Sequence, residues 1–187
     1  HPRVRRERQM CIRDSNDTLH QRQMRVITGK YKGRQFEVPR SFKARPTTDF
    51  AKENIFNVLG GYIDLEGAVA LDLFMGTGSI SLELLSRGCS QVIGVEIDRD
   101  HHAFICQCLK KIGDRNCTPL RADVFKFIKA CRMQFDLIFA DPPYALKELP
   151  EIPEMILNKG MLKEGGLLVF EHGKNLSLIH ISEPTRP

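Results

Sequence analysis

Four consecutive residues, Asp141-Pro142-Pro143-Tyr144, are of the types needed to hold an amino group on a nucleobase. The two prolines carry no backbone N–H, so the segment offers hydrogen-bond acceptors and few donors. The Pro142 carbonyl and the Asp141 carboxylate can converge on one NH₂ group and hold its nitrogen towards an electrophile. Tyr144 supplies a flat face on which an extruded base can stack. The segment therefore favours group transfer to an exocyclic amine over a proline-rich loop that merely ends a strand.

A glycine-rich turn, Gly76-Thr77-Gly78, follows an apolar strand and opens a helix. Its glycines let the backbone approach a ligand closely, and the helix start presents free N–H groups. Asp72 before the turn and Glu96 at the end of the next strand suit the ammonium, sulfonium and ribose of S-adenosylmethionine. Ser81 stands where a dinucleotide fingerprint has its third glycine, which disfavours NAD. The structural alternative is a tight strand–helix turn in which Asp72 is a capping residue.

Other polar and aromatic residues carry weaker signals. Asp123 follows the next strand, where it would either accept a hydrogen bond from an adenine amino group or cap the helix beginning at Val124. The sequence leaves both roles open. His101 and His102 lie at the start of another helix with no pattern of metal ligands, so we predict surface residues and no metal site. Phe50, Phe56, Phe104 and Phe125 lie at helical spacing with other apolar residues, which favours core positions over stacking platforms.

Alternating strands and helices must position these residues. The predicted strands span residues 69–74, 91–96, 118–122, 135–140 and 167–171, and the predicted helices span 79–87, 99–112, 124–131 and 153–162. Such alternation predicts an α/β, Rossmann-like, mostly parallel doubly wound sheet with right-handed crossovers. Ligands bind beyond the carboxyl ends of strands in such sheets, so both motifs are expected at one edge. Ahead of the sheet, residues 25–38 predict a small β-hairpin and residues 49–59 a helix.

Composition and charge narrow the class of protein. The chain has 187 residues, of which 42% are hydrophobic and 27% charged, as expected for one soluble domain. No apolar run is long enough to cross a membrane, and six cysteines without a Cys-x-x-Cys pair indicate reduced thiols in a cytoplasm. The net charge of +5 is uneven, since residues 25–52 hold eight Lys or Arg against two acidic residues. This asymmetry predicts contact with a polyanion, and nucleic acid is the obvious candidate.

Two flanks are expected to lie outside the fold. Residues 1–23 show no apolar period, and residues 176–187 lack any turn-and-strand pattern. We interpret both as non-native segments, although the first could be an RNA-binding arm. No secretion leader is expected. Between the flanks we predict an RNA-contacting extension over residues 24–67 and a cofactor-binding domain over residues 68–175.

Together the motifs resemble those of a known family. The first set is Phe74-x-Gly76-x-Gly78, Glu96, Asp123 and Asp141-Pro142-Pro143-Tyr144, in that order; it is similar to the S-adenosylmethionine-dependent amino-methyltransferases. The second set is Arg25-Val26-Ile27-Thr28-Gly29, Gly33-Arg34 and Arg45-Pro46-Thr47-Thr48-Asp49 leading into Glu53-x-x-Phe56-Asn57. It resembles the bacterial small-subunit ribosomal RNA guanine-N2 methyltransferases. The resemblance covers residues 24–175.

The resemblance implies a class I methyltransferase fold and methyl transfer to N2 of a guanine in 16S rRNA. The implied cofactor-binding residues are Asp72, Phe74, Gly76, Thr77, Gly78, Glu96, Asp123 and Val124, with Glu96 on the ribose and Asp123 on the adenine. Asp141, Pro142, Pro143 and Tyr144 would hold the target amine and base, and Arg34, Arg45, Thr47, Thr48 and Lys52 are the candidates for RNA contact. The implied partner is 16S rRNA, within the small ribosomal subunit or its assembly intermediate, for a monomeric cytoplasmic protein. The C-terminal strand pair of the family is expected to be missing, leaving the sheet edge open.

Three other functions remain open. A DNA adenine-N6 methyltransferase shares Asp-Pro-Pro-Tyr but usually needs a separate target-recognition region. The chain leaves little room for one between the strands at 135–140 and 167–171. A protein glutamine methyltransferase carries Asn where Asp141 stands. A non-catalytic RNA-binding protein would keep the fold without needing the intact glycine turn and Asp141.

Overall fold

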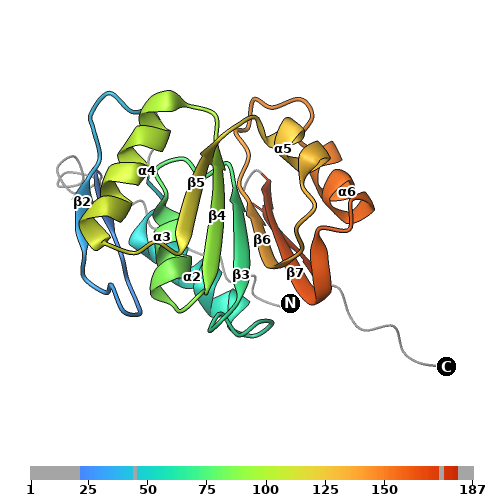
Figure 1. The fold of residues 1–187 in the computed structure, drawn as a ribbon, viewed down its shortest axis with the longest axis horizontal. Coiled ribbons are helices and arrows are strands. Elements are labelled where there is room, and N and C mark those ends of the chain that lie inside the picture. The colour runs from blue at the N-terminus through green and yellow to red at the C-terminus, as the bar shows by residue number, and fades with distance from the viewer. Residues whose placement is uncertain (1–21, 44–45, 173–174, 181–187) are drawn as a thin grey trace, which may run out of the picture.

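A six-stranded sheet forms the centre of the molecule in the computed structural model, which describes residues 22–43, 46–172 and 175–180 (Figure 1). Its strands are β3 (Val69–Leu73), β4 (Gln91–Glu96), β5 (Cys117–Arg121), β6 (Phe135–Ala140), β7 (Leu162–His172) and β8 (Asn175–His180). Their order is β5-β4-β3-β6-β7-β8, and all neighbouring pairs are parallel except β7 and β8. The predicted doubly wound α/β sheet is therefore confirmed.

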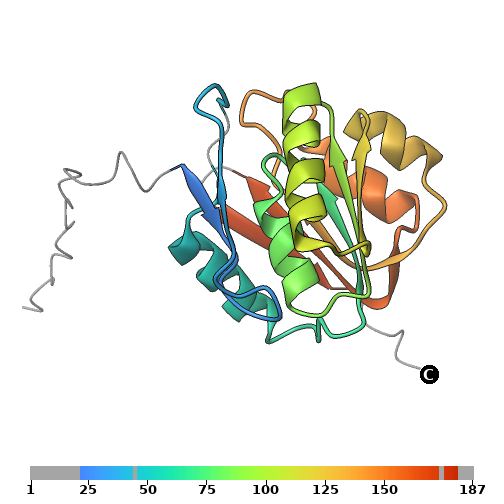
Figure 2. The ribbon, with the colours of Figure 1, turned by 60° about the vertical axis from the view of Figure 1, so that its left-hand side comes forward.

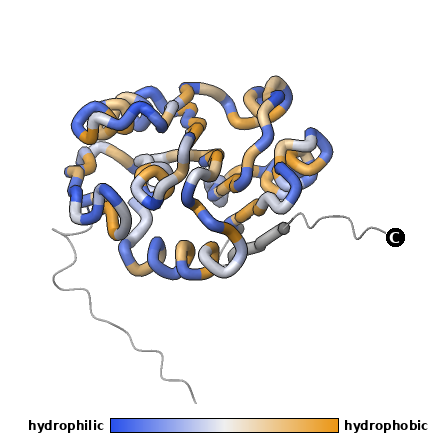
Figure 3. Tube along the Cα trace, turned by 60° about the horizontal axis from the view of Figure 1, so that its bottom comes forward, coloured by the Kyte–Doolittle hydropathy of each residue, from blue (hydrophilic) through white to orange (hydrophobic). Residues whose placement is uncertain are grey.

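Helices cover both faces of this sheet and enclose two apolar clusters. The helices are α2 (Asp49–Leu59), α3 (Ser79–Ser86), α4 (Arg99–Ile112), α5 (Val124–Ala130) and α6 (Glu151–Asn158). Figure 1 shows α2, α3 and α4 on one side of the sheet and α5 and α6 on the other. Hydrophobic and hydrophilic residues alternate along the helices (Figure 3), as expected when one side of each faces the core. The order of connections reverses between β3 and β6, so the carboxyl ends of these two strands frame a ligand-binding crevice.

Local capping explains why several predicted bounds are correct. The Asp98 carboxylate accepts hydrogen bonds from the backbone N–H groups of Asp100 and His101 at 2.9 Å each, which fixes the start of α4. Gly113 ends the same helix in a left-handed conformation with φ of 77°. Thr48 caps α2 in the same way, through a bond of 3.2 Å to the N–H of Ala51. The bounds predicted for α2 and α4 match those observed.

The N-terminal hairpin, β1 (Gln23–Arg25) and β2 (Gln35–Glu37), lies next to α2 at the side away from α5 and α6 (Figure 2). Its loop docks on a buried carboxylate of α3. Glu83 accepts hydrogen bonds from the backbone N–H groups of Ile27 and Thr28 at 3.0 Å each. Arg87 Nε lies 3.1 Å from the same carboxylate. The Glu83 carboxylate thus links the extension to the sheet domain.

Lys52 completes this buried ionic cluster, and its predicted contact with RNA is wrong. Its side chain is 1% exposed, its ammonium donates to the Arg25 carbonyl, and Nζ lies 3.6 Å from a Glu83 oxygen. Burial lowers the pKa of Lys52, while the carboxylate of Glu83 opposes that change. The basic residue serves the interior because the fold brings a carboxylate from α3 to it.

The expectation that the sheet stops at its fifth parallel strand is also wrong. Strand β8 pairs antiparallel with β7 over six positions, from Leu167 opposite His180 to His172 opposite Asn175. Residues 176–180 of β8, placed outside the fold by sequence interpretation, therefore help cover the edge of β7 that was expected to be open. In addition, β7 begins at Leu162, five residues earlier than predicted. No helix among the described residues is long and apolar enough to cross a membrane.

Five cysteines lie in the described part of the chain, and none of these five forms a disulfide. Cys89, Cys108, Cys117 and Cys131 are buried, as expected for small apolar side chains, whereas Cys106 is exposed on α4. Burial raises the pKa of the Cys89, Cys108 and Cys117 thiols to about 12. These three thiols are therefore unreactive packing groups.

Candidate functional site

A pocket of about 550 Å³ opens at the carboxyl ends of β3, β4 and β6. Eleven of the predicted cofactor-binding and catalytic residues line it: Asp72, Phe74, Gly76, Thr77, Glu96, Asp123, Val124, Asp141, Pro142, Pro143 and Tyr144. The glycine turn and the Asp-Pro-Pro-Tyr segment, far apart in the sequence, therefore share one cavity. Its size suits a small organic ligand.

The glycine turn adopts a backbone that few residues tolerate. Phe74, the residue that leaves β3, has a positive φ of 60°, and Gly76 and Gly78 follow with φ of 57° and 83°. A Cβ on Gly78 would lie 2.9 Å from Cγ1 of Ile105, so α4 also packs against this position. Gly78 does not line the pocket itself; it allows the close packing of α3 and α4. Strained non-glycine backbone such as that of Phe74 is typical of ligand-binding turns.

Asp72 lies at the floor of the pocket, 2% exposed. Ser81, which stands where a dinucleotide fingerprint has its third glycine, donates its hydroxyl hydrogen to this carboxylate at 2.6 Å. Burial raises the pKa of Asp72 to about 7, and the nearby carboxylates of Asp141 and Glu96 add to the rise. A buried carboxyl poised near neutrality favours a cationic ligand, because a positive charge would restore the ionised form.

Glu96 is oriented by the backbone at the end of β4. Its two oxygens accept hydrogen bonds from the N–H groups of Gly76 at 2.7 Å and Asp98 at 2.8 Å. The remaining lone pairs are available for ligand hydroxyls. His101 also lines the pocket, with Nδ1 3.9 Å from a Glu96 oxygen and a side chain only 15% exposed. The prediction that His101 is a surface residue is therefore wrong.

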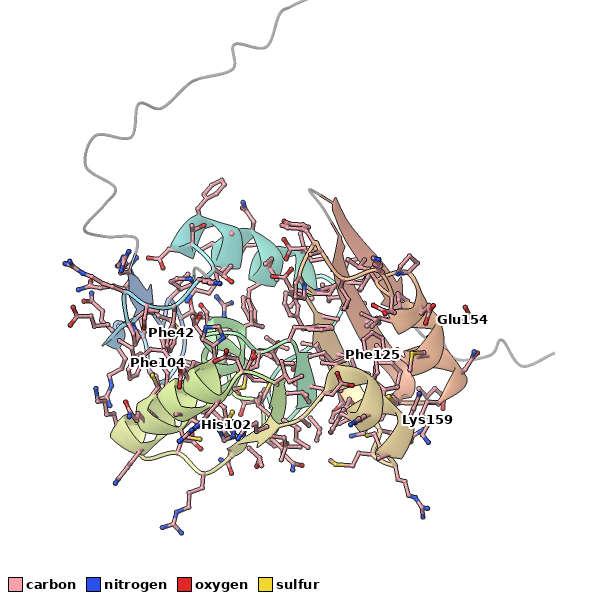
Figure 4. All side chains as sticks on the ribbon, turned by 90° about the horizontal axis from the view of Figure 1, so that it is seen from above. Phe42, His102, Phe104, Phe125, Glu154 and Lys159 are labelled. Carbon is pink, nitrogen blue, oxygen red and sulfur yellow. The ribbon has the colours of Figure 1, made fainter. Side chains whose placement is uncertain are left out.

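Asp123 caps the N-terminus of α5, which is one of the two roles predicted for it. One of its oxygens accepts a hydrogen bond from the Lys126 N–H at 3.0 Å, and the side chain still borders the pocket. The cap leaves the second oxygen for a ligand, so both roles are compatible. Phe125 on α5 (labelled in Figure 4) packs against the apolar cluster under α5 and α6, as predicted, and also lines the pocket. Phe56 and Phe104 are buried as predicted, whereas Phe50 is 74% exposed and its predicted core position is wrong.

The Asp141–Tyr144 segment follows the end of β6 and borders the pocket. Pro142 is buried and Tyr144 is 74% exposed at the pocket mouth. Partial burial raises the pKa of Asp141, although the residue reaches the surface at the rim. Ala140 and Phe170 are paired in the parallel strands β6 and β7, and Asp141 and Glu171 are the residues that follow them in the chain. Burial, and secondly the charge of Asp141, raise the pKa of Glu171.

Sequence reasoning missed several residues of the pocket, and Ser79 is the most informative. Its hydroxyl is buried and has no hydrogen-bond partner among the described residues. Ser79 is the first residue of α3 and lines the cavity. An orphaned buried hydroxyl is costly unless a ligand or water satisfies it. Together with the three carboxylates, it fits a ligand that carries an ammonium group, a cationic centre and hydroxyls.

The predicted RNA-contact residues are dispersed. Thr47 lines the pocket, and Thr48 caps α2 as described above. Arg34 is exposed near the far end of α4, where its guanidinium donates to the Lys111 carbonyl at 2.8 Å. Arg45 lies outside the described residues. The structure therefore brings Thr47 to the pocket and leaves Arg34 distant from it.

Comparison with known proteins agrees with the resemblance seen in the motifs. The model of a family described as "Conserved hypothetical protein 95" matches residues 24–185. The chain belongs to this family. The match extends past residue 175, into the segment that forms β8.

Several proteins similar to this chain are named as methyltransferases. The chain is 38% identical to "Putative rRNA methyltransferase YlbH" of Bacillus subtilis, over 83% of this chain and 85% of that protein. It is 31% identical to "Ribosomal RNA small subunit methyltransferase D" of Escherichia coli K12, over 80% and 74% of the two chains. The solved structure titled "Putative methyltransferase yhhF" from Escherichia coli has a TM-score of 0.70 at 28% identity, covering 79% and 78%. The family resemblance stated from the motifs is confirmed.

Proposed function

We propose that this protein transfers a methyl group from S-adenosylmethionine to the exocyclic N2 amine of a guanine in 16S rRNA. The observation that carries the proposal is the joining of two sites in one pocket. The carboxylates of Asp72, Glu96 and Asp123 line the cavity together with the glycine turn. The Asp141–Tyr144 segment borders the same cavity. The ribosomal RNA methyltransferases among the relatives support an RNA methyltransferase in general. The choice of guanine N2 rests on the motif resemblance.

The cofactor half of the pocket is built for a cation with a ribose. Asp72 and the unpartnered hydroxyl of Ser79 would receive the methionine ammonium, with Gly76 and Thr77 in the turn above them. Glu96, held by two backbone N–H groups, would accept the ribose hydroxyls. The second oxygen of Asp123 would accept the adenine amino group. When bound, S-adenosylmethionine supplies an electrophilic methyl group.

The amine half of the pocket acts by position rather than by strong basicity. The Asp141 carboxylate and the Pro142 carbonyl would each accept one N–H of the target amine, which directs the nitrogen lone pair into the cavity. Tyr144 offers the extruded base a stacking face. Once the nitrogen carries the methyl group, it is cationic and releases a proton to Asp141 or to water. The raised pKa of Asp141 makes it a better proton acceptor than an ordinary carboxylate.

The RNA would approach across the N-terminal extension. Thr47 at the pocket rim and exposed basic residues of the hairpin, including Arg34, would contact its backbone. We place the protein in the cytoplasm as a monomer that acts on the small ribosomal subunit or its assembly intermediate.

One labelling experiment tests this proposal against its alternatives. The protein is incubated with tritiated S-adenosylmethionine and, separately, with unmodified small ribosomal subunits, naked 16S RNA, duplex DNA and ribosomal proteins. We expect labelled N2-methylguanosine from RNA. Labelled N6-methyladenine from DNA, or N-methylglutamine from protein, would replace the proposal with the corresponding alternative. RNA binding with no label in any substrate, unchanged in Asp141→Ala, would indicate a non-catalytic RNA-binding protein.

A further inference from the structure

A group of exposed basic residues lies at the end of α4 that is remote from the pocket. This distal basic cluster consists of Lys30, Lys32 and Arg34 from the hairpin loop and Lys110, Lys111 and Arg115 from the end of α4 and the following turn. All six residues are exposed. They come from two segments that are far apart in the sequence.

Specific contacts bring the two segments together. The Tyr31 hydroxyl donates to Asp114 at 2.5 Å, and Lys30 Nζ lies 2.9 Å from the same carboxylate. Arg34 donates to the carbonyl of Lys111 at 2.8 Å. The hairpin loop is therefore fixed against the end of α4, and its lysines are held beside those of the helix.

The charge of this cluster is almost uncompensated. Asp114 is its single carboxylate, with a side chain only 5% exposed and already bound to Lys30 and Tyr31. These two donors lower the pKa of Asp114 against the opposing effect of burial. Among the described side chains, no ion pair reaches Lys32, Lys110, Lys111 or Arg115. The surface therefore presents concentrated positive charge that the fold does not use.

The position of the cluster relative to the pocket is fixed by one rigid helix. His101, in the first turn of α4, lines the pocket, and Lys110 and Lys111 lie in its last turn. A helix of 14 residues is about 20 Å long. After Asp100, α4 contains no acidic residue, and its exposed side carries uncharged residues such as Ala103 and Gln107 before the lysines. Beyond Asp100, a polyanion could follow α4 to the cluster without meeting a carboxylate of that helix.

We propose that the distal basic cluster binds the sugar–phosphate backbone of the substrate RNA, about 20 Å from the base that enters the pocket. The inference rests on the proposed RNA methyltransferase function and adds a second contact to it. It means that the preferred substrate is a structured RNA that presents the target base and a phosphate run at that separation. Phosphate contacts contribute affinity and orientation but no base specificity.

The test compares two charge-matched triple variants. Lys110→Gln/Lys111→Gln/Arg115→Gln removes three charges of the cluster but keeps the Lys111 carbonyl that holds Arg34. Lys129→Gln/Arg132→Gln/Lys159→Gln removes three exposed charges from the flank formed by α5 and α6, where Figure 4 labels Lys159. The probe is a labelled naked RNA hairpin whose stem is longer than 20 Å and whose loop contains a guanine. Binding is measured from low to high salt, with thermal unfolding of each variant as a check on the fold.

We expect the plot of the logarithm of the association constant against the logarithm of salt concentration to be less steep for the cluster variant. The magnitude of its slope should fall by about 2 to 3, since each duplex phosphate contact contributes about 0.9. Affinity near physiological salt should fall by about tenfold to a hundredfold. The flank variant should bind as the parent does. Methylation of a short single-stranded oligonucleotide, which reaches only the pocket, should be the same in all three proteins.

Two results would overturn the inference. A cluster variant with the parental salt slope would show that these residues make no phosphate contact. Parental binding of naked RNA combined with reduced methylation of assembled subunits would assign the surface to a protein component instead. Binding of the RNA hairpin is measured without methyl transfer, so the two proposals can fail separately. If the cluster variant loses the steep salt dependence but no protein transfers label, the phosphate contact is supported and only the proposed activity fails.

Discussion

Asp141 combines two functions that different substitutions can separate, because its carboxylate is both a hydrogen-bond acceptor and a proton acceptor at the pocket rim. Asp141→Ala removes both, and we expect kcat for methyl transfer to fall by about 10² to 10³. Asp141→Asn keeps an acceptor oxygen and should recover part of that loss. Affinity for S-adenosylmethionine, measured by calorimetry, should change less than twofold in both variants.

A matched control for Asp141 lies in the following loop. Glu148→Gln removes an exposed carboxylate a few residues along the chain and should leave kcat unchanged. Equal activity of Asp141→Ala and the parent would exclude the proposed role of this carboxylate in holding the amine.

Asp72 predicts a pH dependence of cofactor binding, because its pKa is about 7 in the cofactor-free protein. If the ammonium of S-adenosylmethionine binds the ionised carboxylate, affinity should fall about twenty- to thirtyfold between pH 7.5 and pH 5.5. Asp72→Asn should bind weakly and with little pH dependence over this range. Equilibrium dialysis at several pH values would measure both, and a parental affinity independent of pH would contradict the assignment.

The same carboxyl makes a prediction for stability that does not involve the cofactor. Its folded-state pKa is raised above the unfolded value of 3.8, so the folded state binds more protons between about pH 4 and pH 7. The free energy of unfolding should therefore fall across this window as pH rises, by at most about 4 kcal/mol from this group. Urea denaturation of Asp72→Asn should lack that component, whereas Glu164→Gln, an exposed control, should keep it.

At the scale of elements, the ionic cluster between α2 and α3 shows what a sequence can and cannot reveal. The bounds of α2 were predictable because Thr48 and an apolar period mark them locally. The burial of Lys52 was not, because its partner Glu83 lies on another helix and is brought to it by the fold. Phe50 is the converse, an apolar residue that the same helix leaves exposed. Periodicity predicts that a helix has a buried side but does not set the rotation of that side at its first turn.

Glu83 should matter more for stability than Lys52, because four groups depend on it. Glu83→Gln weakens the contacts of Lys52 and Arg87 and disturbs the acceptors for the Ile27 and Thr28 N–H groups. We expect a loss of about 3 to 5 kcal/mol in the free energy of unfolding. Lys52→Met leaves Arg87 on the carboxylate and should cost about 1 to 3 kcal/mol.

Urea denaturation of both variants measures this order. Glu53→Gln, an exposed change on the same helix as Lys52, should stay within about 0.5 kcal/mol of the parent. A larger loss in Lys52→Met than in Glu83→Gln would contradict the view that the carboxylate is the common anchor. Because Lys52 is buried, Lys52→Met should also leave the salt dependence of RNA binding unchanged.

For the molecule as a whole, the positions of the two motifs were predictable because parallel strands place their carboxyl ends at one edge. Asp72 lies near the carboxyl end of β3 and Asp141 follows the neighbouring strand β6, and this sheet order brings them to one pocket. The outer edge of the sheet was not predictable in the same way. Residues 175–180 contain too short an apolar pattern to indicate a strand, and their pairing is set by β7 rather than by local sequence.

Strand β8 leads to a prediction about the entire molecule, since it covers β7 along six positions. A chain ending at His172 would present the row of unpaired N–H and C=O groups of β7, an edge that is open to pairing with a second copy. We expect this shortened protein to unfold at a lower temperature and to elute from a sizing column as dimers or larger species. A chain ending at His180 removes residues 181–187 but retains β8, and it should elute and unfold as the full chain does. If the chain ending at His172 remained monomeric and equally stable, β8 would not be protecting the edge, and the sheet would be complete with its five parallel strands.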